Sequence, residues 1–428
     1  MRRVYLLAAL AFGAVLLGLL TLDGSLLIFS VPLIVFIASS LLFSPTRPQL
    51  EIARKLDIER VSPGGTVTAQ ITVTNHGGAI EAMQLTNLFP DGLQLTGGMA
   101  NIAAWLRRGE SKTFTQVFSG QRGQYIFDEI AVHAGDHFDL FSHRLSQAAG
   151  GRLVVVPRAE RLKAIKIRPR RTRVYAGLIP TRSSGPGIDY YGIRQYVAGD
   201  PLRWVDWKTS ARHQDKFFTK LFEQERAADV GLILDARRSS STHAGESSIF
   251  EHSIQAAAAL SETLLAAGNR VGLLVYGDLL DWTFLAYGKI QHERILQRLA
   301  QARQGDSPAF NKLDNLPTRL FHPQSQLIFI SSLIEKDIEN LYHLRARGYQ
   351  VLVVSPNPVS FAAPRLAPSD FDDLAIRAAH LERILMLRKV RRGGIQVLDW
   401  HVHIPFKQSA HASLSRNPLW MRSIGLDA

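Results

Sequence analysis

Two uncharged apolar runs at the start of the chain constrain its fold more than any other feature. Residues 4–22 read VYLLAALAFGAVLLGLLTL, and residues 26–43 read LLIFSVPLIVFIASSLLF. Each run approaches the roughly 20 residues that a helix needs to cross the hydrocarbon core of a membrane. Asp23-Gly24-Ser25 between them is a polar turn signal. Because lipid cannot satisfy exposed backbone groups, we predict a hairpin of two transmembrane helices, about 4–22 and 26–43, within residues 1–46.

A cleaved signal peptide is the competing interpretation, since Arg2 and Arg3 precede the first run. That run is long for a signal core, no small-x-small cleavage site follows it, and a second apolar run begins at once. The hairpin is therefore the preferred prediction. Basic residues stand at both of its ends, at Arg2-Arg3 and at Arg47, Arg54 and Lys55. Both ends, and the soluble domains, are thus predicted to lie on the cytoplasmic side of the inner membrane.

Length and charge narrow the classes of protein further. A chain of 428 residues predicts two or three folded domains, and the absence of cysteine excludes disulfides and thiolate metal sites. The net charge of +13 favours an anionic partner. Nine basic residues and one acid lie between Arg158 and Arg182. The lipid bilayer itself accounts for this charge, and no nucleic-acid-binding motif is present, so we expect no nucleic-acid partner.

Short alternating stretches follow the hairpin. Residues 66–74 alternate apolar and polar side chains and stop at Asn75-His76-Gly77-Gly78, as a strand followed by a turn does. Similar runs come at 84–88, 112–118, 124–132 and 152–156. Strands at this spacing predict an antiparallel β-sandwich over residues 47–157, without a catalytic constellation.

Strand-like and helical patterns alternate from residue 221 onward. Residues 230–234 are continuously apolar, as in a strand buried on both faces, and residues 250–267 form an alanine-rich amphipathic helix. Further strands are predicted at 271–276, 282–286 (a possible edge strand), 326–330, 350–355 and 395–400, and further helices at 291–304, 335–347 and 371–392. This alternation predicts a Rossmann-like α/β domain over 221–408 with a mostly parallel sheet. The last residues, 409–428, show no periodicity and are predicted to be disordered.

A long motif occupies residues 187–212 and reads GIDYYGIRQYVAGDPLRWVDWKTSAR. FEQER at 222–226, GDHFDLF at 135–141 and Pro157-Arg158 fit the same pattern. Together these stretches resemble the bacterial and archaeal family called domain of unknown function fifty-eight, over nearly the whole chain. The resemblance implies an α/β domain of the von Willebrand factor A type and association with MoxR-type AAA+ ATPases. It carries no established enzymatic reaction.

The resemblance also implies a place to look for a metal. Von Willebrand A domains often bind Mg²⁺ through Asp-x-Ser-x-Ser at a strand end, because a hard divalent cation prefers carboxylate and hydroxyl oxygens. Here Asp235-Ala236-Arg237-Arg238-Ser239 keeps only the first and last of these residues, and Ser332 stands where a further Asp is expected. We therefore expect no cofactor rather than Mg²⁺ at the degenerate set Asp235, Ser239 and Ser332. Arg237 or Arg238 is instead predicted to meet an acidic partner directly.

The motif segment, together with the basic linker before it, is assigned to residues 158–220 and mixes charged with aromatic side chains. One interpretation is a recognition surface, because aromatic and arginine side chains supply most interface hot spots. The other is a network of Arg–Asp pairs that locks the segment against the α/β domain. The candidate partner-binding residues in it are Arg194, Tyr196, Asp200, Arg203, Trp204, Asp206, Trp207, Lys208 and Arg212.

These patterns predict a membrane-anchored, non-enzymatic interaction protein that works with a MoxR-type AAA+ ATPase in protein-complex maturation or in envelope-related functions. No nucleophile–base pair stands at a recognisable spacing, and no Gly-rich phosphate loop is present. Two alternatives stay open: a metal-dependent hydrolase that uses the Asp235 region, and an envelope structural protein whose soluble part lies outside the cell.

Overall fold

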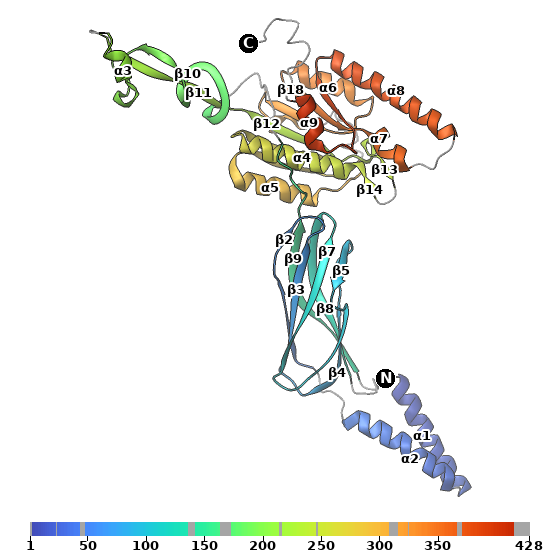
Figure 1. Ribbon diagram of the computed structural model, residues 1–428. Coiled ribbons are helices and arrows are strands. Elements are labelled where there is room, and N and C mark those ends of the chain that lie inside the picture. Colours follow the sequence, from blue (N-terminus) through green and yellow to red (C-terminus); the bar gives the residue numbers. More distant parts are fainter. Residues whose placement is uncertain are drawn as a thin grey trace. The chain divides into compact units, whose positions relative to one another are not determined.

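The computed structural model describes residues 2–22, 24–42, 48–135, 142–162, 173–213, 216–244, 247–307, 316–323, 325–365 and 370–414. The chain divides into two compact units, Met1–Val156 and Pro157–Ala428 (Figure 1). Most of the predicted family element at 135–141, and the basic residues at 163–171, lie outside the described residues.

Two apolar helices begin the first unit, α1 (Arg2–Thr21) and α2 (Gly24–Leu42). They contact each other, and Gly18 allows a close approach, because a Cβ there would lie 3.0 Å from the Leu27 side chain. Val4–Thr21 and Gly24–Leu42 are both long and apolar enough to cross a membrane. The two apolar helices of the sequence prediction are therefore confirmed as helices.

Two β-sheets make up the rest of the first unit. The first has the strand order β1 (Leu50–Leu56), β3 (Thr66–Asn75), β7 (Ser111–Gly120), β5 (Leu93–Gly97) and is antiparallel throughout. The second has the order β2 (Arg60–Val61), β9 (Ser142–Val155), β8 (Gly123–Gly135), β4 (Ile80–Asn87), β6 (Asn101–Leu106). Its one parallel pair joins β2 to β9.

The two sheets share a core. Ile71 and Val73 of β3 pack with Leu85 of β4 and Ile130 of β8 in one buried cluster. Burying one such side chain contributes about 1.5–3 kcal/mol relative to leaving it in water. Along β3 the buried positions alternate with more exposed ones, and this alternation is what the sequence pattern of residues 66–74 predicted.

The second unit contains a six-stranded sheet. Its order is β16 (Leu280–Ala286), β15 (Arg270–Tyr276), β12 (Asp229–Asp235), β17 (Gln326–Ile330), β18 (Gln350–Pro356), β19 (Gln396–Trp400). Only β16 runs antiparallel to its neighbour. The sheet is thus mixed, and β16 is the edge strand that the sequence suggested.

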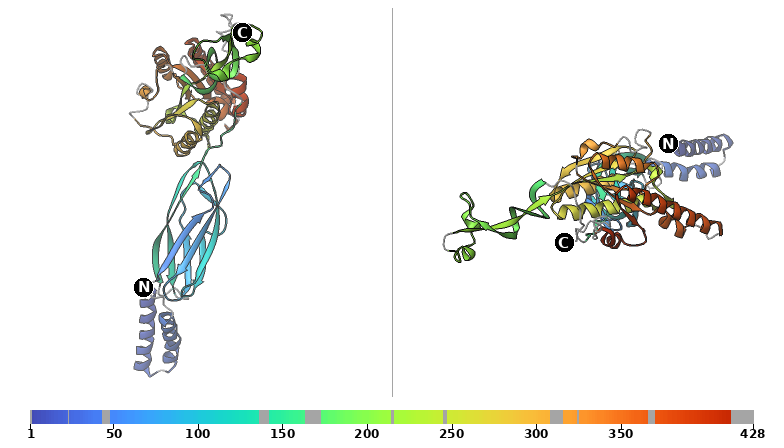
Figure 2. Two further views of the ribbon diagram at one scale, coloured as in Figure 1. Left: turned by 90° about the vertical axis from the view of Figure 1, so that its left-hand side faces the viewer. Right: turned by 90° about the horizontal axis from the view of Figure 1, so that it is seen from above.

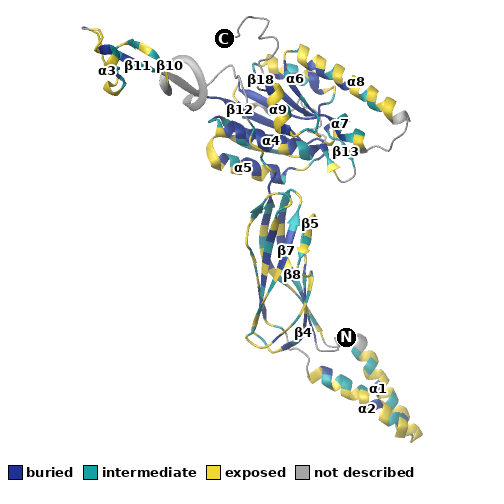
Figure 3. Ribbon diagram, in the orientation of Figure 1, coloured by how far each residue is buried: buried dark blue, intermediate teal, exposed yellow. Residues whose placement is uncertain are grey.

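Helices cover both faces of this sheet. Figures 1 and 2 show α4 (Ile249–Ala266) and α5 (Gly288–Gln301) on one face. The other face carries α6 (Asp337–Ala346) and α8 (Asp370–Arg392), whose apolar side chains join the strands in one buried cluster. The central strands are buried along their length (Figure 3). Shorter helices are α7 (Pro358–Ala362) and α9 (Phe406–Leu414).

Helix α9 corrects one prediction. Residues 409–428 were expected to be disordered, but 409–414 belong to α9, and 415–428 lie outside the described residues. Phe406, Ala410 and Leu414 are spaced four residues apart and are all buried. This apolar stripe holds the helix, and it is too short to stand out as a periodic pattern.

A two-stranded arm corrects a second prediction. The segment 158–220 was expected to be a linker with the motif attached, whereas Arg173–Gln195 forms β10 and pairs antiparallel with β11 (Phe218–Ala227). Between the two strands lie the short turn η1 (Leu202–Trp204) and helix α3 (Trp207–Ser210). We call residues 173–227 the arm and residues 192–221 its tip; both are green in Figure 1.

The hairpin predicts a testable topology. Alkaline phosphatase fused after Leu414 should be inactive and a green fluorescent protein fused there should fluoresce, because the basic residues at both ends of the helices favour the cytoplasm. Alkaline phosphatase fused directly after Gly24, between the helices, is the matched control and should be active. An active enzyme at Leu414 would show that the soluble units lie outside the cell.

Candidate functional site

The carboxyl ends of β12 and β17 mark the position where open α/β sheets bind ligands. The strand β15 lies on one side of β12, and β17 lies on its other side. The chain connections therefore diverge between β12 and β17. Asp235 is the last residue of β12, and Ser331 follows the end of β17. A ligand site is therefore expected at this point of the sheet.

Arg237 occupies this point. The residue is 1% exposed, and its guanidinium lies between two carboxylates. Nε and Nη2 donate to Oδ1 and Oδ2 of Asp235 at 2.8 and 2.7 Å. Nη1 and Nη2 donate to Oδ1 and Oδ2 of Asp337 at 3.0 and 2.9 Å. Each carboxylate is thus bound bidentately, the strongest geometry available to an Arg–carboxylate pair.

Neighbouring groups satisfy the remaining acceptor positions of both carboxylates. Ser331 Oγ donates to Asp235 Oδ2 at 2.6 Å, and the Arg237 backbone N–H donates to Asp235 Oδ1 at 3.1 Å. The Ile334 N–H donates to Asp337 Oδ2 at 3.1 Å. The side chains of Asp235 and Asp337 are 0% and 2% exposed. This Arg237 cluster is a closed network that presents neither carboxylate to solvent.

The charges and hydrogen bonds of the cluster keep the Arg237 guanidinium positively charged. Burial lowers the pKa of the Arg237 guanidinium, but the hydrogen bonds and charges of Asp235 and Asp337 outweigh burial and raise that pKa above its ordinary value. Burial raises the pKa of the Asp337 carboxyl, the hydrogen bond from Arg237 opposes this rise, and the nearby Asp235 charge adds to it. Two acids share one cation, and the pKa of the Asp337 carboxyl lies above its ordinary value.

A second buried arginine covers the ends of the next strands. Arg383 of α8 donates to Asp399 Oδ1 through Nε and Nη2 at 3.0 and 2.7 Å. It also donates to the Ser332 carbonyl oxygen at 3.1 Å and to Ser355 Oγ at 3.0 Å. Burial lowers the pKa of Arg383, and Asp399 opposes that shift. Side chains of the protein itself thus fill the carboxyl edge of the sheet from β12 to β19.

The predicted metal set is not brought together. Asp235 lies in the Arg237 cluster, Ser239 is exposed, and Ser332 offers its carbonyl oxygen to Arg383. In the described part of the chain, no three His, Asp or Glu side chains are placed to hold a metal ion. A guanidinium stands where Mg²⁺ would need open oxygens, so the residues present do not fit that cation.

Asp337 is the residue that the sequence interpretation missed. It looked for the second acid at the strand end, where Ser332 stands, whereas the acid comes from the first turn of α6. Arg237 is buried and paired, so its predicted contact with an acidic partner has no exposed surface to use. The neighbouring Arg238 is exposed.

The arm tip uses its acidic residues internally. Asp200 accepts hydrogen bonds from Arg194 Nη2 at 2.6 Å, from the Val197 N–H at 3.1 Å and from Thr219 Oγ1 at 3.3 Å. These bonds, first that of Val197 and then that of Arg194, hold the pKa of Asp200 below its ordinary value. The carboxylate therefore ties the start of the loop to β11.

Asp206 has a similar internal role. Its side chain caps α3 by accepting from the backbone N–H groups of Lys208 and Thr209 at 3.2 and 3.3 Å. Ser210 Oγ accepts from the Phe218 N–H at 2.9 Å and closes the turn onto β11. The hydrogen bonds of Asp200 and Asp206 stay within the arm, so they order the tip itself.

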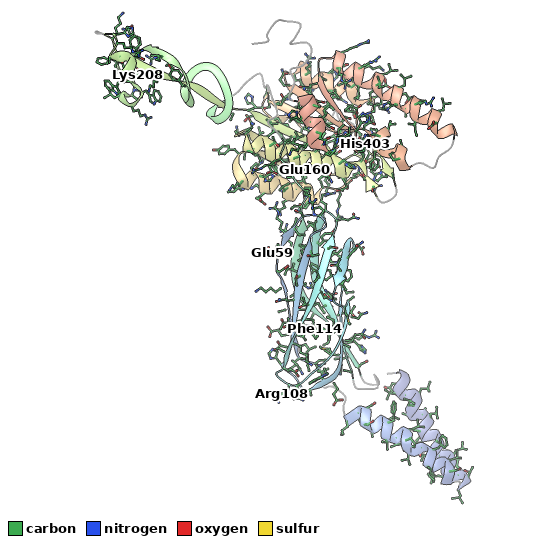
Figure 4. All side chains as sticks on the ribbon, viewed as in Figure 1. Glu59, Arg108, Phe114, Glu160, Lys208 and His403 are labelled. Atoms are coloured by element: carbon green, nitrogen blue, oxygen red, sulfur yellow. The ribbon has the colours of Figure 1, made fainter. Side chains whose placement is uncertain are left out.

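Most of the exposed residues in the described part of the tip are apolar or basic. Leu202, Trp207 and Phe217 are 69%, 62% and 58% exposed, and the rings of Trp207 and Phe217 meet edge to face at 6.3 Å. The exposed candidate residues are Arg203, Trp207, Lys208 and Arg212, whereas Arg194, Tyr196, Asp200, Trp204 and Asp206 are half-buried. Figure 4 labels Lys208 at this end of the arm.

Comparison with known proteins places a family match over the arm tip and most of the six-stranded sheet. Residues 192–373 match the family described as Protein of unknown function DUF58. The chain is also 22% identical over 274 residues to the uncharacterized protein YeaD of Bacillus subtilis, covering 63% of this chain and 66% of that protein. The chain thus spans just under two thirds of this relative. The match contains the residues of the motif from 192 onward and the Arg237 cluster.

Two solved structures resemble small parts of the chain. A CARDB domain from Pyrococcus furiosus is 19% identical, with a TM-score of 0.19 over 26% of this chain and 89% of that domain. A PapD-like domain of human CEP192 is 15% identical, with a TM-score of 0.18 over 24% of this chain and 85% of that domain. Scores this low support no argument about function.

Replacing Arg237 should leave a position that a metal cation can fill. In Arg237→Ser, Asp235 and Asp337 face each other without a counter-charge, so we expect the free energy of unfolding to fall by about 3–5 kcal/mol. Millimolar Mg²⁺ or Mn²⁺ should restore part of it, since two carboxylates and hydroxyl groups suit a hard cation. Melting of the full chain in detergent, with EDTA and then with each cation, measures both effects.

Arg383→Ser is the matched control for this experiment. It also removes a buried guanidinium, but it leaves only one carboxylate, that of Asp399, so the variant should lose stability without responding to metal. If Arg237→Ser gained no more stability from the cations than the unaltered protein, the guanidinium would not be standing in for a cation.

The raised pKa of Asp337 gives a pH dependence with a defined sign. Between its ordinary value of 3.8 and the raised folded-state value, the folded protein keeps a proton that the unfolded chain has released. The stability contribution of this group is therefore present below pH 3.8 and decreases as the pH rises through the folded-state pKa. The melting temperature of Asp337→Asn minus that of the unaltered protein should rise over this range and then level off. A difference that stayed flat over this range would contradict the prediction.

Proposed function

We propose that this protein is a membrane-anchored, non-enzymatic interaction protein whose second unit is a von Willebrand A-like domain with a side chain in place of its metal ion. The anchor is the pair of apolar helices, with both ends in the cytoplasm. The partner that we propose is a MoxR-type AAA+ ATPase, which the family resemblance implies. The working context is the maturation of protein complexes or an envelope-related function.

The Arg237 cluster supports a binding role over a hydrolytic one. A hydrolase at the Asp235 region would need an acid or base in contact with substrate or water. Both oxygens of Asp235 already accept hydrogen bonds from Arg237, and Ser331 donates a further one to Oδ2. With the usual ligand edge of the sheet filled, contacts to partners have to come from other surfaces.

The composition of the arm tip is the observation that carries this proposal. The two acids described in the tip, Asp200 and Asp206, accept internal hydrogen bonds, while a tryptophan, a leucine and a phenylalanine stand exposed among basic side chains. Exposed aromatic and arginine residues are the side chains that most often dominate binding energy at protein interfaces. The tip therefore suits an apolar pocket with an acidic rim on the ATPase.

Trp207→Ala should weaken capture of the ATPase without unfolding the protein. Trp207 is 62% exposed, so its loss should leave the melting temperature nearly unchanged but cost about 2 kcal/mol or more of binding energy. The measurement is affinity capture of the tagged full chain from detergent-solubilised membranes, with a MoxR-type ATPase that binds ATP but cannot hydrolyse it.

Trp105→Ala provides the matched control, because Trp105 is also half exposed but lies in the first unit. It should capture as much ATPase as the unaltered protein does. If the full chain captured no ATPase, the proposed partner would be wrong. Equal capture by both variants would instead show that the tip does not hold the partner.

A further inference from the structure

The edge strand β16 lacks two of the features with which sheets normally prevent edge-to-edge pairing, although its ladder with β15 has an irregularity between Val271 and Leu273. It reads LDWTFLA, without proline or lysine, and forms its ladder with β15 on one side only among the described residues. Native edge strands are usually protected by such residues, because their free N–H and C=O groups can pair with another chain. Here Trp282 and Phe284 are 41% and 71% exposed instead.

A groove runs between this strand and helix α5. It has a volume of about 700 Å³ and is lined by β16 and by one side of α5. The α5 residues Arg294, Gln297, Arg298 and Gln301 recur at helical spacing, so they form one wall. Gln291 fixes the two elements together, since its Nε2 donates to the carbonyl oxygens of Val271 and Phe284 at 2.8 Å each. The two walls of the groove are therefore linked by hydrogen bonds.

Positive charges outnumber negative charges among the side chains that line the groove. Its one acid, Asp281, pairs with Arg298 at 2.9 Å. Arg294 is exposed and has no ion pair within the described part of the chain. An exposed arginine next to glutamine side chains and two aromatic residues favours a ligand that combines carboxylates with apolar groups.

We propose that this groove binds an extended acidic segment of a partner protein, which adds to β16 as a further strand. Main-chain hydrogen bonds to the edge would provide affinity, and alternate side chains would select the sequence. Carboxylates of the segment meet Arg294, and apolar side chains contact Trp282 and Phe284. This site is separate from the arm tip and does not depend on the identity of the partner bound there.

A second copy of the chain is a poorer occupant than an acidic segment. If β16 paired with itself about a two-fold axis, both α5 helices would lie on the same face of the joined sheet. Arg294 and Arg298 of each copy would then flank one seam, and their like charges would oppose association. The same charges attract an acidic strand.

The test uses a fluorescent peptide of three Glu-Val repeats and the full chain in detergent. Fluorescence anisotropy should show saturable binding, and Arg294→Glu should weaken it by about tenfold, equivalent to about 1.4 kcal/mol. Arg303→Glu makes the same charge change at an exposed position beyond α5 that does not line the groove, and it should bind like the unaltered protein.

Two further peptides separate strand addition from simple charge attraction. A Lys-Val peptide should bind only to Arg294→Glu, and the Glu-Val peptide with alternate backbone nitrogens methylated should not bind, because it cannot complete the ladder. Equal binding of the methylated peptide, or no effect of Arg294→Glu, would overturn the proposal. So would a dimer of the unaltered protein in sedimentation that Arg294→Glu makes tighter, since that result would assign the edge to a second copy.

Discussion

The contact between Arg237 and the carboxylates of Asp235 and Asp337 holds together the centre of the second unit. It links the end of β12 to the first turn of α6, which follows β17, so it spans the two strands where the chain connections diverge. Burying three charged groups costs free energy, and only nearly complete hydrogen bonding offsets that cost. The cluster meets this condition through Ser331 and the backbone N–H groups of Arg237 and Ile334. Loss of the Arg237 charge would therefore leave two buried carboxylates without a counter-charge.

Filling the usual ligand edge moves any binding to other parts of the unit. The arm tip exposes apolar and basic side chains because Asp200 and Asp206 are engaged in ordering its turns. The groove at β16 is a different kind of surface from the arm tip. It exposes a strand edge and an arginine at the margin of the sheet. One surface suits an apolar pocket and the other an extended strand, so the two could engage different features of a partner at the same time.

Patterns along the chain predicted the elements whose stability is local or whose burial is continuous. β17 occupies Gln326–Ile330, as the apolar run indicated, and α4 begins and ends within one residue of its predicted bounds. The arm was not predicted, because a two-stranded ribbon has no core face to leave a periodic signal. Asp337 was not predicted because its partner Arg237 is 100 positions away in sequence, and only the sheet topology brings them together. An acid in the first turn of a helix is ordinarily explained by the helix dipole.

The Arg237 cation is covalently part of the chain, so it cannot regulate the domain in the way that a bound metal ion can. A domain that holds an exchangeable ion can be loaded or emptied by the ion supply and by chelators, and its affinity for an acidic partner changes accordingly. The Arg237 guanidinium can neither dissociate nor lose its proton at any pH at which the protein is folded. The core geometry is therefore constitutive, insensitive to the ionic composition of its compartment. Under the proposed function, the timing of partner engagement would then come from the supply of partners or from energy spent on their side of the interface.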